Sequence, residues 1–151
     1  MLNRLSVMHT ILLPVDESKE RAMRAAETVL ELPGGPEEKA VVLVNISEST
    51  KQPWLREFET QRAEGKADPE LPESTNAAYE LLTDHGIDVE TRFERGSVTD
   101  QILAVADEVD ADNIIMSGRK KSAAGKMLFG SVTQSVLLES TRPVTVLLDE
   151  S

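Results

Sequence analysis

Short strand-like segments alternate along the chain with segments whose apolar residues recur every three or four positions. Most of the strand-like segments are nearly continuous apolar runs, which is typical of strands buried on both faces of a sheet. Residues 87–95 instead alternate apolar and polar side chains, which indicates an edge strand with one face in water. The expected strands are residues 10–15, 41–46, 87–95, 114–116 and 144–148. With four helical segments between them, they predict an α/β domain whose parallel sheet carries helices on both faces.

The expected helices are bounded by recognisable end signals. The first begins behind residues 16–18 (DES) and stops at residues 33–36 (PGGP). Gly86 closes the second helix as a C-terminal cap. Ser97, followed three positions later by Asp100, opens the third.

At 151 residues the chain is expected to form one domain, spanning residues 1–151. A strand begins so directly at Met8 that residues 1–7 are interpreted as a leader from an upstream start codon. Residues 47–72 are the least regular stretch, and stretches of this length are often lids or mobile loops. For Trp54 and Phe58 within it, packing in the core or in an interface is favoured over stacking on a base.

The chain has no cysteine, which excludes disulfides and thiolate metal sites and favours the reducing cytoplasm. Its formal net charge of -11 repels nucleic acid and anionic membranes, so neither is expected as a partner. Acidity with few lysines suggests adaptation to high intracellular salt. An ordinary acidic cytosolic protein is the alternative, and composition does not separate the two.

Residues 113–136 (NIIMSGRKKSAAGKMLFGSVTQSV) combine a strand, a glycine-bearing loop and a helix start. We expect the strand to end at Ser117-Gly118 and the helix to open at Gly130-Ser131. In such an arrangement free N–H groups and the positive end of a helix dipole point at one anion. The loop carries four cations in an otherwise acidic chain: Arg119, Lys120, Lys121 and Lys126. It is therefore interpreted as a phosphate site, with a solvated basic loop as the alternative.

This loop is not a Walker A motif. Gly118 and Gly125 are too far apart, and Met127 stands where that motif needs a magnesium-binding hydroxyl.

Asp16 is a second candidate for a ligand-binding residue, beside the basic loop. Ligands of open α/β sheets bind beyond the carboxyl ends of strands, where the strand order reverses. Asp16 ends the first strand and Ser117-Gly118 the fourth, so Asp16 faces the basic loop if these strands are neighbours.

Three blocks of sequence resemble the universal stress protein (UspA-like) family, and the resemblance covers nearly the whole length. They are residues 10–18 (TILLPVDES), 116–136 (MSGRKKSAAGKMLFGSVTQSV) and 142–148 (RPVTVLL). With its acidic composition the chain is similar to halophilic archaeal members. The resemblance implies an adenine nucleotide alpha hydrolase-like, Rossmann-like fold: an open, doubly wound five-stranded parallel sheet of order 3-2-1-4-5. It also implies a homodimer through the last strand, Val144 to Leu148, and an apolar edge strand of this kind is a hazard unless it is covered.

The resemblance further implies an adenine-nucleotide site. In nucleotide-binding members Asp16 would contact the adenosine part, Val44 the base, and Gly130, Ser131 and Thr133 the phosphates. Those members carry Gly-x2-Gly-x9-Gly-[Ser/Thr], and its first two glycines fall here on Ser117 and Lys120, with Gly118 one place away. A Cβ at those positions opposes close approach of the backbone to phosphates, while the added lysines offer charge. The nucleotide-binding residues we expect are Val15, Asp16, Val44, Met116, Ser117, Gly118, Lys120, Gly130, Ser131, Val132 and Thr133.

Two functions are compatible with this pattern. One is a regulatory stress-response protein that binds ATP or AMP, with Mg²⁺ held by Asp16 through water. The other is a dimeric protein that binds no nucleotide and engages an unnamed protein partner through its sheet edge or residues 47–72. Catalysis has little support, because His9 and His85 are not spaced to serve a nucleophile and Ser131 has no base in its motif. ATP hydrolysis is expected to be slow or absent.

Overall fold

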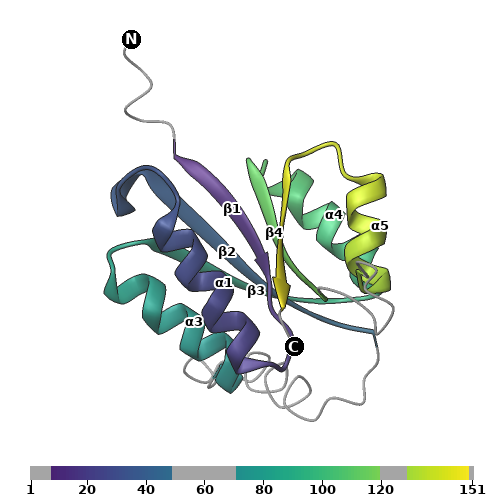
Figure 1. Ribbon diagram of the computed structural model, residues 1–151, viewed down its shortest axis with the longest axis horizontal. Helices are drawn as coiled ribbons and strands as arrows, with labels where there is room; N and C mark the ends of the chain where they lie inside the picture. Colours follow the sequence, from purple (N-terminus) through teal and green to yellow (C-terminus); the bar gives the residue numbers. More distant parts are fainter. Residues whose placement is uncertain (1–7, 49–70, 120–128, 150–151) are drawn as a thin grey trace, which may run out of the picture.

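The structure is a computed structural model that describes residues 8–48, 71–119 and 129–149 (Figure 1). The predicted leader, most of the irregular stretch (residues 49–70) and the basic loop (residues 120–128) lie outside the described residues, and so does Lys120.

The described residues form one parallel sheet of order β3-β2-β1-β4-β5, as expected. The strands are β1 (His9–Pro14), β2 (Lys39–Ser47), β3 (Asp88–Arg95), β4 (Asn113–Arg119) and β5 (Val144–Asp149). The helices are α1 (Lys19–Glu31), the short 3-10 helix η2 (Pro36–Glu38), α3 (Glu73–Asp84), α4 (Val98–Glu108) and α5 (Ser131–Glu139). The helices α1 and α3 cover one face of the sheet, and α4 and α5 cover the other (Figure 1).

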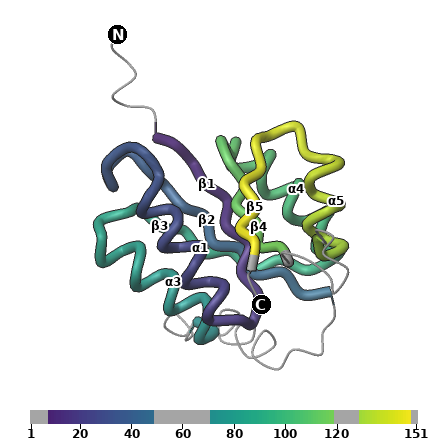
Figure 2. Tube along the Cα trace, viewed as in Figure 1, coloured from purple at the N-terminus to yellow at the C-terminus, as the bar shows by residue number. Residues whose placement is uncertain are grey.

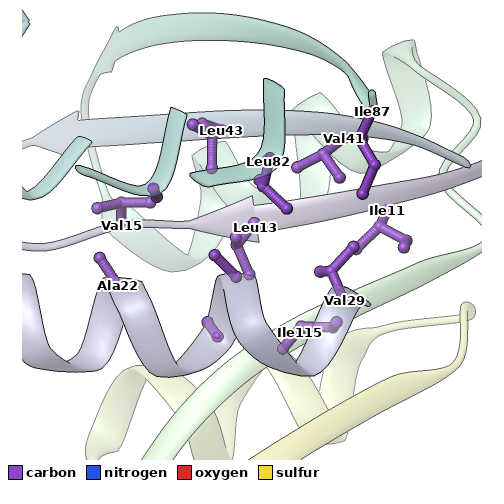
Figure 3. Packing of buried hydrophobic residues seen from close by; sticks show 13 residues of the cluster. Ile11, Leu13, Val15, Ala22, Val29, Val41, Leu43, Leu82, Ile87 and Ile115 are labelled. Carbon is purple, nitrogen blue, oxygen red and sulfur yellow. The ribbon is translucent and has the colours of Figure 1, made fainter. Parts of the chain in front are cut away.

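Alternation along the central strands supplies a separate core to each face. Ile11 and Leu13 of β1 point toward α1 and α3, whereas Leu12 between them points toward α4 and α5. All three are fully buried. Figure 3 shows the first core, in which side chains of β1, β2 and β4 meet Ala22 and Val29 of α1 and Leu82 of α3. Continuous apolar strands are therefore needed because both faces are covered.

The strand β4 is longer than expected. It continues through Ser117 and Gly118 to Arg119, and Gly118 is paired with Leu148 of β5. A Cβ on Gly118 would lie 3.0 Å from Val146 Cγ1 and 3.2 Å from Phe129 Cδ1. The prediction that the strand ends at Ser117-Gly118 is wrong, because this glycine makes room for packing instead of forming a loop.

The predicted end signals agree with the observed caps. The Ser18 side chain accepts a hydrogen bond from Arg21 N, and the Ser97 side chain accepts one from Asp100 N. Gly86 has a φ of +85°, which glycine adopts at little cost and which ends α3. Lys39 was not singled out from the sequence, although it is only 3% exposed. Its ammonium donates to Val29 O and Leu32 O and so satisfies carbonyls at the end of α1.

Within the described residues, no helix combines the length and the apolar character that crossing a membrane requires.

Candidate functional site

A cavity of about 620 Å³ opens at the carboxyl ends of β1 and β4. These strands are neighbours in the middle of the sheet, as the order of the strands requires (Figure 2). The helix after β1 runs over one face and the helix after β4 over the other, so the connections diverge and leave a crevice. Its volume lies in the range of about 300–1,000 Å³ that is typical of small-molecule sites.

Most of the residues expected from the sequence lie around this one cavity. Those that line it are Val15, Asp16, Val44, Met116, Ser117, Val132 and Thr133. Gly130 and Ser131 are exposed at the start of α5 and are not among its lining residues, and Gly118 is buried against β5. The wall of the cavity thus joins the end of β1 to the end of β4 and the first turn of α5.

The carboxylate of Asp16 is held by the turn that follows it. Its Oδ1 accepts a hydrogen bond from Ser18 N at 2.9 Å, which is an Asx turn leading into the helix cap. Its Oδ2 accepts two from Arg21, from Nε at 3.2 Å and from Nη2 at 2.9 Å. The two side chains are 56% and 44% exposed, so the ion pair is open to solvent at the rim of the cavity.

A buried polar group supports this turn from below. Asn45, which is 6% exposed on β2, donates from Nδ2 to Val15 O at 3.0 Å. Its Oδ1 accepts from Thr75 Oγ1 at 2.7 Å, and Ser74 Oγ donates to Asp16 O at 2.7 Å. The first turn of α3 is thereby fastened to the turn that carries Asp16.

The opposite wall is formed by the start of α5. Thr133, which is 4% exposed, donates from Oγ1 to Ser117 O at 2.9 Å and ties the helix to the end of β4. No side-chain hydrogen bond from the described residues caps α5, and its N-cap, Gly130, is open. A Cβ built on Gly130 has no described atom within 4 Å. Among the described residues, none occupies the first backbone N–H groups of α5 with a side-chain cap, and N–H groups in this position can bind an anion.

The charge around the cavity is mostly negative on the side of α1 and α3. Among the described lining residues, the carboxylates are Asp16, Glu17 and Glu73, and Arg21 is the one cation. Lys19 lies 3.5 Å from Glu73. On the side of α4 and α5 the lining is apolar, with Val98, Ile102 and Val132. The described residues contain no group of acidic or histidine side chains placed to hold a metal ion.

Several lining residues were missed by sequence reasoning: Arg21, Asn45, Ile46, Glu73, Ser74, Val98 and Ile102. Asn45 left a signal, because it is a polar residue in an apolar strand. Arg21 left only a weak one, since a charged residue in the first turn of an amphipathic helix usually faces water. Ile46 could have been inferred from Val44, because residues two apart on a strand point to the same face of the sheet. Val44 is fully buried, whereas Ile46 is partly exposed toward the cavity.

The fold is that of a doubly wound α/β protein, and the cavity lies at its topological switch point, where such folds commonly bind ligands. The universal stress protein family matches residues 8–147, and the chain belongs to that family. A universal stress protein of Synechocystis, Sll1654, is 33% identical over 138 residues, which are 91% of this chain and 83% of the relative. One of Mycolicibacterium smegmatis is 38% identical over 64 residues, which are 42% of this chain and only 49% of the relative.

Solved universal stress proteins share the fold. One from Archaeoglobus fulgidus superposes with a TM-score of 0.65 at 27% identity, covering 93% of this chain and 98% of the other. A structure from the same organism in complex with dAMP has a TM-score of 0.61 at 24% identity and covers 93% of this chain and 98% of the other. Another, in complex with cAMP, has a TM-score of 0.62 at 20% identity, with 94% and 98% covered. These likenesses establish the adenine nucleotide alpha hydrolase-like fold of the chain.

Proposed function

We propose that this universal stress protein binds an adenine nucleotide, AMP or ATP, in the cavity between β1 and β4 and acts as a regulatory protein with little or no catalysis. The observation that carries the proposal is the pairing of an acceptor with donors across one crevice. Asp16 lines one side, and beyond the other stands the first turn of α5, which no side chain of the described residues caps. The complexes of related proteins with cAMP and dAMP support an adenine nucleotide as the ligand.

The chemistry of the walls fits such a ligand. The acidic side toward α1 and α3 disfavours phosphates and favours hydroxyl donors, so the ribose belongs near Asp16. Phosphates belong at the start of α5, where N–H groups and the helix dipole favour negative charge. Gly130, Ser131 and Thr133 would lie nearest to them, and Lys120 is proposed to add charge there. The base would lie against apolar side chains. Val44, expected at the base from the sequence, lines the cavity but is fully buried, so Val15, Ile46 and Met116 are the candidates.

Calorimetry tests the proposal. We expect ATP and AMP to bind with micromolar affinity, about -8 kcal/mol, and Asp16→Asn to weaken binding by about tenfold or more, since it removes a charged acceptor. The matched control is Asp88→Asn on β3, an exposed carboxylate that does not line the cavity. Titrations with and without Mg²⁺ show whether the metal accompanies ATP. No heat at millimolar nucleotide would end this proposal.

A second candidate function rests on the exposed edge of the sheet. The edge strand β5 is apolar, and Leu138 on the neighbouring α5 is 77% exposed. A homodimer through β5, or a complex with another protein at this edge, would cover it. This function needs no nucleotide and would survive failure of the calorimetric test. A cytoplasmic setting and adaptation to high salt are proposed from composition alone.

A further inference from the structure

We propose that Arg21 sets the sugar specificity of the site by occupying one oxygen of Asp16, so that the site grips a single ribose hydroxyl and tolerates a deoxyribose. This inference rests on the proposed function. It adds a specificity-determining residue and states which nucleotides the site should fail to distinguish.

The argument begins with the acceptor capacity of the carboxylate. An ionised carboxylate offers about four acceptor positions, roughly two on each oxygen. Among the described residues, Arg21 supplies two donors to Oδ2 and Ser18 N supplies one to Oδ1. These contacts within the described part of the chain leave one acceptor position, and it belongs to Oδ1. It can take one hydroxyl, whereas a grip on the neighbouring 2′ and 3′ hydroxyls needs both oxygens.

Local structure keeps Arg21 in this position. The backbone N of Arg21 donates to Ser18 Oγ at 3.2 Å. The backbone N of Ser18 in turn donates to Asp16 Oδ1. Asp16, Ser18 and Arg21 therefore form one closed hydrogen-bonded unit within six residues of chain. A second ribose hydroxyl would have to replace one of the Arg21 bonds. Exchange of one hydrogen bond for another gives little net gain.

The test compares AMP with 2′-deoxy-AMP by calorimetry, in the unchanged protein and in Arg21→Met. We expect the unchanged protein to bind the two nucleotides within about threefold of each other, because the second hydroxyl adds little net binding. In Arg21→Met the freed oxygen accepts that hydroxyl, and 2′-deoxy-AMP should bind on the order of tenfold more weakly than AMP. The ratio is the readout, because loss of a positive charge alone changes the affinity for both nucleotides alike.

Two further variants separate occupancy from charge. Lys19→Met removes the same charge from the same turn of α1, but Lys19 contacts Glu73 and not Asp16, so the ratio should stay unchanged. Arg21→Lys keeps the charge and loses the planar fork, so its ratio should move toward that of Arg21→Met. Arg21 is exposed, and thermal unfolding of each variant verifies that the fold is retained.

The outcomes are distinguishable. A large preference for AMP in the unchanged protein, or a ratio that Arg21→Met leaves unaltered, overturns this inference while nucleotide binding stands. Absence of binding by either nucleotide overturns the proposed function, and this inference with it.

Discussion

Asn45 shows how a single polar side chain can determine the shape of an otherwise apolar site. It is nearly buried, and its amide connects the carbonyl of Val15 to the hydroxyl of Thr75. An apolar side chain at this position could neither donate to Val15 O nor accept from Thr75 Oγ1. The Asn45–Thr75 pair therefore fixes the turn that carries Asp16 relative to α3. Leaving either buried polar group without its hydrogen bond would cost free energy of folding.

Asn45→Ala is expected to lower the free energy of unfolding by about 2–3 kcal/mol, because it leaves a buried carbonyl and a buried hydroxyl without their partner. Urea denaturation measures this change. Thr75→Val is the matched control, since it keeps the shape and orphans only Asn45 Oδ1, and it should cost about 1–2 kcal/mol. Equal stabilities of the two variants and the unchanged protein would show that water replaces the lost contacts.

At the scale of single residues, the sequence predicts the polar candidates better than their partners. Asp16 and Ser117 were identified because each follows an apolar run, and the strand order brings them together. Arg21 was missed because its contact with Asp16 depends on the path of the turn, which spacing does not reveal. Lys39 was missed because a lysine at the start of a strand normally reaches water.

The sequence predicts the presence of the strands and helices better than the residues at which they end. The five strands and the long helices follow from periodicity and caps, whose physics is local. The end of β4 was misjudged at Gly118, because glycine has two uses that the sequence does not distinguish. It permits turns, and it also makes room for a neighbouring side chain, here Val146 and Phe129.

This second use predicts a contrast between two glycines. Gly118→Ala should destabilise the protein by about 1–3 kcal/mol, because its new methyl group meets packed atoms of β5 and Phe129. Gly130→Ala should cost no more than about 1 kcal/mol, because the described atoms leave that space open and only the usual penalty of an N-cap alanine remains. Thermal unfolding of both variants gives the comparison. If Gly130→Ala were the more damaging change, close packing at Gly118 would not be the reason for its glycine.

For the whole molecule, the edge of β5 offers a direct test of the proposed homodimer. Pro143 O accepts a hydrogen bond from Ile114 N. In this register the backbone N–H and C=O groups of the odd-numbered residues of β5 point toward β4, and those of the even-numbered residues point away from it. Val146 N–H consequently points to the open edge. Val146→Pro removes this donor without breaking the ladder to β4, and proline is tolerated on edge strands. We expect a monomer from sedimentation of Val146→Pro and a dimer from the unchanged protein.

Val146→Ala is the control for this change, since it loses the same side-chain packing near Gly118 but keeps the N–H. It should remain dimeric. A Val146→Pro protein that folds and still sediments as a dimer would exclude pairing through β5. The complex would then have to use another surface, such as the one around Leu138.

The net charge of -11 affects stability through the whole surface. Like charges repel one another across the folded molecule, and salt shortens the range of that repulsion from about 10 Å at 0.1 M to about 3 Å at 1 M. The melting temperature should therefore rise with KCl over this range, by about 3 °C for each 1 kcal/mol of repulsion that is removed.

A variant with three exposed glutamates neutralised (Glu27→Gln, Glu31→Gln and Glu139→Gln) isolates the charge effect from the general action of salt on water. It should be more stable at low salt and respond less steeply to KCl. Parallel curves for the two proteins would mean that the acidic surface does not limit stability, and adaptation to high salt would lose its physical basis.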